Sequence, residues 1–371
     1  MTTTPPSTDP AARLARIRAE IDALDTSLVQ MLSSRAALSR EVGQIKADSR
    51  EAIFKPFREK EVLDRLAGLG NGSLPEEHLR AIYREILSSS RRLQRPQKVA
   101  FLGPVGTFSH FAGLEYLGQS LEYEPKRDFK AIFSAVASRE ADLGVVPLEN
   151  SLHGSVGQSL DLFLRFEVFI QAEIYCKISN SLLSRERDLS SITVVYSHAQ
   201  PLAQCAEWLR TNLAHARLEP TASTAAAAQR AASESGAAAV GHRRLAPMHD
   251  LNILAGAIED LQDNWTRFLI IGPTPPQEGN RDKTSILFTL PDTPGALVNI
   301  LRRLAMEGIN MKKLESRPLR SEKWKYVFFA DVECDLNLDQ YRDLLAGLKN
   351  QCHTLRVLGS YPAGPYLEMG E

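Results

Sequence analysis

The sequence contains four cysteines, and their spacing excludes the chemistry that cysteines often perform. Cys176, Cys205, Cys334 and Cys352 lie far apart among 371 residues and match no zinc-binding or redox pattern. We therefore expect ordinary reduced thiols, no metal site and a cytoplasmic location.

The sequence also lacks long apolar segments and an excess of charge of either sign. No apolar run approaches the roughly 20 residues of a membrane span. Residues 1–10 are rich in Thr and Pro and lack the apolar segment of a signal peptide. Lys and Arg total 44 against 45 Asp and Glu, which does not favour nucleic acid or an anionic membrane as a partner. We expect a soluble protein of two or three domains.

What the sequence does contain, first, is a long amphipathic helix that should run from about residue 10 to Ala47. Its apolar residues recur at alternating three- and four-residue steps, which is typical of a helix packed against other helices. Such a helix is too long for its own short domain and predicts a partner, most simply a second copy of the chain. The apolar seam consists of Leu14, Ile17, Ile21, Leu24, Leu28, Met31, Leu38, Val42 and Ile45.

One position of this seam carries a charge. A guanidinium at Arg35 needs an anion or hydrogen-bond acceptors in the helical core. A structural ion pair, for example with Glu41, is one interpretation, and a ligand-binding role is the other. Lys46 favours the ligand, because eleven residues at roughly 100° each return to within about 20° of the same face. The two cations predict a pocket for a small dianion.

Further polar residues fall on two shorter helices, which Pro56 and Pro75 should begin. Arg18 lies about 100° from Arg35 around the first helix, so only a second chain could deliver it to the same pocket. The set lacks a thiol, a metal site and a paired acid and base, and it therefore indicates electrostatic complementarity rather than covalent catalysis. The additional members are Arg58 and Glu59 on the second helix, and Ser90 and Gln94 on the third.

Residues 97–273 change to a pattern of short strands and helices. Apolar strands are expected at residues 98–103, 143–147, 167–173, 192–197, 237–240 and 268–271. Helical stretches alternate with them, which predicts an α/β domain with a mostly parallel sheet.

Polar side chains follow several of these strands, where ligands bind in α/β proteins. The Gly/Pro-rich turn that ends at Thr107 leads into a helix and could hold a carboxylate, or it could be a plain turn. It is neither a dinucleotide fingerprint nor a P-loop, so no nucleotide is expected. Ser197 lacks a nucleophile-elbow context, so no hydrolase triad is expected, and His198 is interpreted as structural. The other candidates are Glu149, Asn150, Ser151, Gln204, Thr266, Arg267 and Phe268.

A Pro/Gly linker at residues 273–280 precedes a third segment, residues 281–362. Its expected elements follow the order βαββαβ, which is the ferredoxin-like α+β arrangement. They are a strand at 284–290, a helix at 294–307, strands at 310–316 and 324–333, a helix at 338–349 and a strand at 354–360. Two motifs stand out, namely Gly295, Ala296, Leu297 and Val298 at a turn, and Glu315, Ser316, Arg317 and Pro318 at a strand end.

The helical segment, residues 10–95, resembles the all-helical chorismate mutases in residues 17–25, 32–35, 42–46 and 57–63. The resemblance implies an intertwined homodimer, or a larger homo-oligomer, with active sites built across both chains. The reaction is a pericyclic rearrangement, which needs only preorganised cations and donors. Some members carry an acidic residue where this chain has Lys55, to which we assign no role.

The same resemblance implies a role for each polar residue of the helical segment. Arg35 and the partner's Arg18 would hold the carboxylates of chorismate. Lys46 and Gln94 would hydrogen-bond the ether oxygen whose bond breaks. Glu59 would bind the ring hydroxyl, with Arg58 and Ser90 assisting.

Residues 97–273 resemble the prephenate dehydratases, whose motifs occur here in order. They are the Gly-Pro-x-Gly-Thr turn, Pro-Leu-Glu-Asn-Ser at 147–151, Tyr-Ser-His-x-Gln-Pro at 196–201 and Thr-Arg-Phe at 266–268. The resemblance implies two α/β lobes, like those of periplasmic solute-binding proteins, with the site in the cleft between them. Thr266 would donate a proton to the departing hydroxyl, and a weak acid suffices because decarboxylation yields an aromatic ring.

The other dehydratase candidates would hold prephenate in the cleft. Asn150, Ser197 and Gln204 would position the substrate. Glu149 would lie near its hydroxyl and Arg267 near a carboxylate. The expected set is completed by Thr107, Ser151 and Phe268.

The two motifs of the third segment resemble those of the ACT regulatory domain of the same enzymes, where phenylalanine binds between two chains. Gly295 would let the ligand approach the backbone closely. The three segments together predict a bifunctional enzyme of phenylalanine biosynthesis that acts on chorismate and prephenate, needs no cofactor and is inhibited by phenylalanine. The alternatives are a dehydratase whose mutase segment serves only oligomerisation, and a two-lobed ligand-binding sensor.

Overall fold

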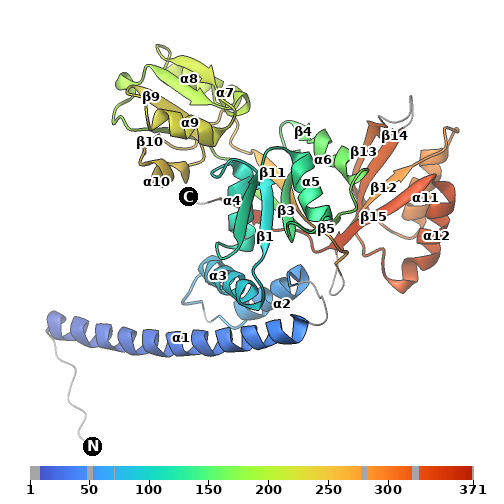
Figure 1. Ribbon diagram of the computed structural model, residues 1–371, viewed down its shortest axis with the longest axis horizontal. Helices are drawn as coiled ribbons and strands as arrows, with labels where there is room; N and C mark the ends of the chain where they lie inside the picture. Colours follow the sequence, from blue (N-terminus) through green and yellow to red (C-terminus); the bar gives the residue numbers. More distant parts are fainter. Residues whose placement is uncertain (1–8, 48–52, 71, 277–281, 320–325, 370–371) are drawn as a thin grey trace, which may run out of the picture.

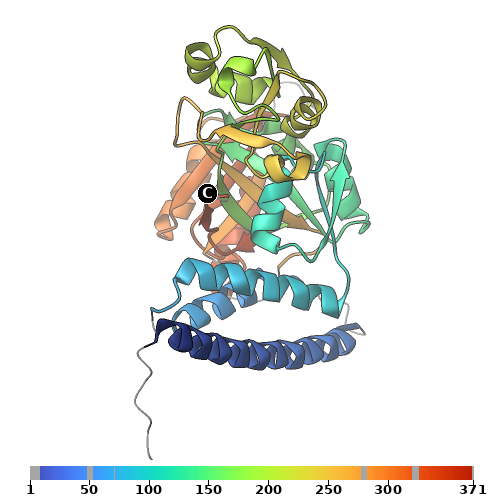
Figure 2. The same cartoon turned by 90° about the vertical axis from the view of Figure 1, so that its left-hand side faces the viewer.

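The computed structural model describes residues 9–47, 53–70, 72–276, 282–319 and 326–369. A two-lobed α/β unit forms the middle of the molecule (Figure 1). The helical domain lies below lobe 1, lobe 2 lies above it, and the C-terminal domain lies beside it (Figures 1 and 2). Residues 277–280 of the expected linker are outside the described part of the chain.

The helical domain consists of α1 (Pro10–Ala47), α2 (Pro56–Ala67) and α3 (Glu76–Gln94). As predicted, the first helix is long, Pro56 begins α2 and Pro75 immediately precedes α3, although α2 ends before Leu69. Gly43 allows α1 to approach α3 closely, because a Cβ there would lie 2.7 Å from the Cα of Gln94. The remainder of α1 extends past the other helices (Figure 1), and its apolar seam is exposed from Leu14 to Met31.

Lobe 1 is a sheet in the order β16-β5-β11-β3-β1-β2, with the short β4 paired to β3. Two of its helices, α4 and α5, begin at side chains that cap them. For example, the Thr107 hydroxyl accepts the backbone N–H of His110. The strands are β1 (Lys98–Leu102), β2 (Glu122–Lys126), β3 (Leu143–Asn150), β4 (Gly154–Ser155), β5 (Phe169–Lys177), β11 (Trp265–Gly272) and β16 (Tyr366–Leu367). The helices are α4 (Phe108–Leu117), α5 (Phe129–Ala137) and α6 (Gly157–Phe163).

Lobe 2 is a sheet in the order β10-β6-β9-β7-β8. Two crossings connect the lobes, because β5 leads into β6 and β10 leads back into β11. The strands are β6 (Ser181–Ser184), β7 (Val194–Ser197), β8 (Arg217–Pro220), β9 (Ala237–Gly241) and β10 (Asn252–Ala255). The helices are α7 (Ala199–Gln204), α8 (Ala206–Asn212), α9 (Thr224–Ala231) and α10 (Leu245–His249), with a 3-10 turn at Leu189–Ser191.

The expectation of a mostly parallel sheet is wrong in both lobes, which are mixed. The returning strand β11 runs antiparallel to both of its neighbours, β3 and β5, and β6 runs antiparallel to β9 and β10. The sequence did not reveal this, because central strands buried on both faces read as continuous apolar runs whatever their direction. The sequence analysis also missed the short strands β2, β4, β6, β8, β10 and β16.

The C-terminal domain has the predicted βαββαβ order, with the sheet order β13-β14-β12-β15. Its helices cover one face of the sheet. The other face packs against lobe 1, and Leu287, Phe329 and Leu358 share one apolar core with Phe163 and Ile170. The elements are β12 (Lys283–Thr289), α11 (Ala296–Met306), β13 (Met311–Pro318), β14 (Tyr326–Val332), α12 (Arg342–Gln351) and β15 (Thr354–Tyr361), with a 3-10 turn at Asp339–Tyr341. Residues 324–325 of the expected third strand are not described.

The C-terminal tail returns from the C-terminal domain to lobe 1, where β16 pairs in parallel with β5. Tyr366 stacks on Tyr175, with the ring centroids 4.6 Å apart. Among the described residues, no helix combines the length and apolar character that crossing a membrane requires. The cytoplasmic location stays a prediction.

Candidate active sites

A charged cavity of about 340 Å³ lies between the three helices of the helical domain. The period of α1 brings Arg35 and Lys46 to one wall, and the close contact at Gly43 brings Gln94 to them. Arg58, Glu59 and Ser90 complete the predicted set in this cavity, and Lys55 also lines it. Only Arg18 of the predicted mutase residues is absent, because it lies about 25 Å from Arg35 along the helix axis.

Two polar contacts fix side chains within this cavity. Arg35 donates to the hydroxyl of Ser90. Glu59 is ion-paired with Arg91, whose side chain is almost fully buried and also donates to the carbonyl of Leu117 in lobe 1. Sequence reasoning missed Arg91, although it lies four residues after the buried Leu87 on α3 and therefore faces inward.

A neighbouring cavity of about 750 Å³ continues the charged cavity of the helical domain toward lobe 1. Lys46 and Gln94 line both cavities. The far side of the larger one is formed by Arg139 and the buried Gln97 and Gln171.

A second candidate site is a cavity of about 250 Å³ between the two lobes. Lobe 1 contributes Asn150 from β3, and Thr266 and Phe268 from β11. Lobe 2 contributes Gln204 from α7 and the Ser223-Thr224 pair at the start of α9. Thr107 is the N-cap residue of α4 and also lines the cavity. Sequence analysis missed Ser223 and Thr224. Ser109 and Gln200 belong to segments that it singled out without listing them as site residues, and His198, interpreted as structural, lines the cavity as well.

Asn150 and Thr266 are cross-strand neighbours and form the polar centre of this cavity. The side-chain amide of Asn150 donates to the Thr266 hydroxyl at 3.0 Å and to the side-chain oxygen of Asn264 at 2.7 Å. Thr266 is 9% exposed. Because its oxygen already accepts this hydrogen bond, its own proton is available to an acceptor in the cavity.

The cavity offers N–H groups and hydroxyls to an anion rather than positive side chains. No Lys or Arg is among the described residues that line it. The N-termini of α4 in lobe 1 and α9 in lobe 2 both border it, at Thr107–Ser109 and Ser223–Thr224. Their unpaired backbone N–H groups and helix dipoles favour carboxylates from two sides.

The structure does not bring four of the predicted dehydratase residues into this cavity. Glu149 and Arg267 alternate with Asn150 and Thr266 along their strands, so they point to the opposite face, toward the C-terminal domain. Ser197 is fully buried and donates to the carbonyl of Val240 at 2.6 Å. Ser151 contacts the Asp263 carbonyl and the Trp265 N–H outside the cavity. The expected direct contacts of these four with prephenate are therefore not supported.

Arg267 is instead part of a buried charge cluster between lobe 1 and the C-terminal domain. It pairs with Glu173 at 2.6 Å and with Asp331 at 2.5 Å, and Lys283 pairs with the other oxygen of Glu173 at 2.6 Å. Burial alone would lower the pKa of Arg267, but Tyr361, Asp331 and Glu173 hold that pKa well above its ordinary value. The guanidinium is therefore charged, and both of its terminal nitrogens contact groups at the domain interface.

The two motifs of the C-terminal domain differ in what they contact. Gly295 has φ +84° and open space around it, and Val298 is exposed at the start of α11. By contrast, Glu315 accepts from Ser155 and Arg317 pairs with Asp161 at 2.9 Å, so both face lobe 1. Ser316 and Pro318 alternate with them and are exposed.

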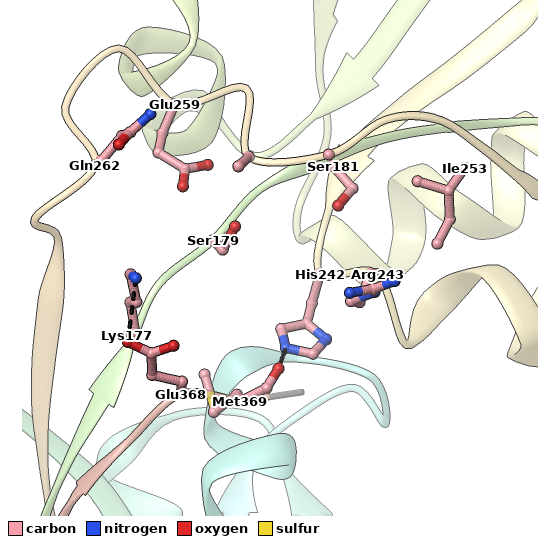
Figure 3. A pocket seen from close by; sticks show the side chains of 12 residues that line it. Lys177, Ser179, Ser181, His242, Arg243, Ile253, Glu259, Gln262, Glu368 and Met369 are labelled. Atoms are coloured by element: carbon pink, nitrogen blue, oxygen red, sulfur yellow. Dashed lines mark hydrogen bonds and ion pairs between the residues drawn. The ribbon is translucent and has the colours of Figure 1, made fainter. Parts of the chain in front are cut away.

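A further cavity of about 520 Å³ lies at the crossings between the lobes and is bordered by the C-terminal tail (Figure 3). Several of its polar groups are already paired. Lys177 pairs with Glu368 at 3.3 Å, and Glu259 accepts the Asn180 N–H at 2.7 Å. The ring of His242 donates to the Met369 carbonyl and accepts the Arg244 N–H, and burial lowers its pKa to about 4. The C-terminal tail therefore contacts both lobes beside this cavity, through Glu368 to Lys177 and through Met369 to His242.

The fold and these cavities define a class of protein. It is an enzyme with a charged helical site, a separate site between two α/β lobes and an appended ferredoxin-like domain. Family comparisons agree with each part. Residues 17–95 match chorismate mutase type II, residues 99–276 match prephenate dehydratase and residues 284–349 match the ACT domain.

The chain belongs to the bifunctional chorismate mutase/prephenate dehydratase family. The protein of that name from Aquifex aeolicus is 40% identical over 353 residues, which cover 94% of this chain and 98% of the relative. The chain therefore has chorismate mutase and prephenate dehydratase activities and acts in phenylalanine biosynthesis.

Solved structures are similar to the part of the chain after the helical domain. The prephenate dehydratase from Arthrobacter aurescens, in complex with L-Phe, is 33% identical with a TM-score of 0.65, and the match covers 71% of this chain and 90% of that one. A structure described as GqqA, a novel type of quorum quenching acylase, is 28% identical with a TM-score of 0.66 and covers 72% of this chain and 99% of that one.

Proposed function

We propose that the charged cavity of the helical domain is the mutase site and that the interlobe cavity is the dehydratase site. The observation that carries the first assignment is the convergence of Arg35, Lys46, Glu59 and Gln94 on one cavity. Arg35 would hold a carboxylate, and Lys46 with Gln94 would stabilise the charge that develops on the ether oxygen as chorismate rearranges. Arg58 and Ser90 would orient these groups.

We propose that each mutase site is completed by Arg18 of a second chain. The apolar seam of α1 is exposed over most of its length, including Ile21, Leu24 and Leu28. A face of this kind is stabilised by a second copy of the same helix. In an antiparallel pair, the partner's Arg18 would approach Arg35 and supply the second carboxylate contact.

In the dehydratase site, Thr266 is proposed to donate a proton to the hydroxyl that leaves prephenate. The hydrogen bond from Asn150 directs the threonine proton away from the amide and into the cavity. The helix N-termini at Thr107 and Ser223 would bind the two carboxylates, and Gln204 and Phe268 would position the ring. Decarboxylation and loss of water then yield phenylpyruvate.

The C-terminal domain is proposed to bind phenylalanine and to inhibit the dehydratase. One of the similar structures is described as a complex with L-Phe. The residues from Gly295 to Val298 lie at an exposed helix start, where a second chain could complete a site. Glu315–Pro318 would form the other part of the allosteric set.

The shared mutase site is tested by mixing two inactive variants, Arg18→Ala and Arg35→Ala. Each homodimer lacks an essential arginine in both sites. A mixed dimer has one site with both arginines intact, so random exchange of chains should restore about a quarter of wild-type chorismate consumption. Mixing either variant with itself is the control. Mixtures that stay inactive after denaturation and joint refolding would contradict a site built across two chains, provided that wild type survives the same treatment.

A further inference from the structure

The two strands that carry the centre of the proposed dehydratase site, β3 and β11, present one row of residues on each face of the sheet. On the cavity face, Asn150 of β3 lies opposite Thr266 of β11. On the other face, Glu149 lies opposite Arg267, one position along each strand. Because alternate residues of a strand point to opposite faces, a shift of Glu149 or Arg267 moves Asn150 or Thr266 with it.

Both residues of the rear row are held by charged side chains of the C-terminal domain. Lys313 of β13 pairs with Glu149 at 2.9 Å and donates to Ser155 at 2.8 Å. Asp331 of β14 pairs with Arg267 at 2.5 Å. Glu149 and Ser155 face each other across the β3–β4 hairpin, so Lys313 contacts both strands of this hairpin. Asn150 is the last residue of its first strand, β3.

Lys313 has a second carboxylate partner, Glu315. This residue belongs to the segment Glu315–Pro318, which is proposed above to form part of the phenylalanine site. The ammonium of Lys313 lies 3.2 Å from Glu315, which also accepts from Ser155. Lys313 is 12% exposed and Glu149 is 37% exposed, so solvent screens the contact between them only in part. A charged group that binds beside Glu315 therefore changes the strength of the ion pair between Lys313 and Glu149.

We propose that Lys313 is a positioning residue for the dehydratase reaction and the link through which the C-terminal domain controls it. Its bond to Glu149 keeps Asn150 at hydrogen-bonding distance from Thr266. An amino-acid effector whose ammonium group binds near Glu315 changes the balance between the two carboxylates around Lys313 and displaces the hairpin. This inference depends on the dehydratase site proposed above.

The test compares Lys313→Met with Lys313→Arg in the full-length protein. Lys313→Met should lower kcat for prephenate at least about tenfold, because small displacements of catalytic groups are costly. KM should change less than about threefold, since Lys313 does not line the cavity. The phenylalanine concentration for half-inhibition should shift at least about fivefold. Lys313→Arg keeps the charge and should restore kcat to within about threefold of wild type.

Two comparisons separate positioning from general damage. Lys312→Met removes the adjacent lysine, which pairs with Glu333 at the surface, and should leave all three quantities unchanged. In Glu149→Gln/Lys313→Met, the loss of kcat should not exceed that of Lys313→Met alone, since that variant has already lost the contact with Glu149. Chorismate consumption reports on folding of the helical domain in every variant, and a thermal unfolding curve reports on folding of the rest of the chain.

Two results would overturn the inference. One is an unchanged kcat in Lys313→Met while wild type turns over prephenate. The other is a double variant in which the fold-loss of kcat equals the product of the fold-losses in the two single variants. If wild-type prephenate turnover survives the loss of the Thr266 hydroxyl, the proposed dehydratase site fails instead, so the two failures are distinguishable.

Discussion

Lys46 reaches the mutase cavity because of the residue one turn before it. Gly43 has no side chain to separate α1 from α3, so the backbone of Gln94 lies against it. Lys46 and Gln94 then border the same cavity. The ammonium and the amide can both act on one oxygen, which is where negative charge develops in the proposed rearrangement.

Lys46→Met should lower kcat for chorismate by about 10²–10³-fold, because it removes a preorganised cation from the transition state. Lys46→Arg should retain part of the activity. The matched control is Lys60→Met, which removes an exposed lysine that pairs with Asp64 on α2. The kcat of each variant for chorismate is measured by the loss of chorismate absorbance. The turnover of prephenate by each variant should stay within about twofold of wild type. A Lys46→Met enzyme with wild-type mutase activity would contradict the assignment.

Residues on helices were easier to place from the sequence than residues on strands. The 3.6-residue period of α1 fixes the face of Arg35 relative to Lys46 once the apolar seam is known. In the motif Thr266-Arg267-Phe268, neighbours must face opposite ways, but the sequence does not reveal which face borders the substrate. The rear face is covered by Asp331, more than 60 residues later, so the role of Arg267 depended on a tertiary contact.

At the scale of elements, the order of helices and strands was largely predictable and the direction of strands was not. The βαββαβ pattern of the C-terminal domain occurs as expected. The antiparallel direction of β11 results from the crossing that returns the chain from lobe 2 to lobe 1. This direction matters to the site, because it sets Thr266 opposite Asn150.

The long helix α1 shows what a single chain leaves unexplained. Its periodicity predicted a helix with one apolar face, and the helix forms over Pro10–Ala47. The seam remains exposed because α2 and α3 are too short to cover it. The exposed seam and the isolated Arg18 have the same proposed solution, which is a second copy of the chain.

At the scale of the whole molecule, lobe 1 connects the parts through charges and through the tail. The cluster around Arg267 and Glu173 ties it to the C-terminal domain. Arg91 ties it to the helical domain. The tail pairs with β5, and the carbonyl of Met369 accepts from His242 in lobe 2. Protonation of a buried group at one of these junctions should therefore affect stability.

Acid should destabilise the molecule through its buried imidazoles. Burial lowers the pKa of His242 to about 4 and that of His110 to about 4, from 6.5 in each case. Between these values the unfolded chain binds more protons, so the stabilisation is complete above pH 6.5 and is lost as pH falls toward 4. The loss from His242 is about 2 kcal/mol at pH 5.

This pH dependence is measured by urea unfolding at pH 7.5 and pH 5. His242→Gln should reduce the difference in unfolding free energy between the two pH values, because glutamine at position 242 binds no proton in this pH range. The same substitution at the exposed His215 is the control. An unchanged difference in His242→Gln would show that this imidazole does not set the acid sensitivity.

The central claim is that one chain holds two independent sites, and Thr266→Val tests it most directly. Valine keeps the size of threonine and removes only the hydroxyl that Asn150 contacts. When the variant is given chorismate and its products are separated, prephenate should accumulate in amounts equal to the chorismate consumed, and phenylpyruvate should form at least about 10²-fold more slowly than in wild type. Thr266→Ser should restore its formation. Wild-type phenylpyruvate formation in Thr266→Val, or loss of both reactions in a variant that remains folded, would contradict the account.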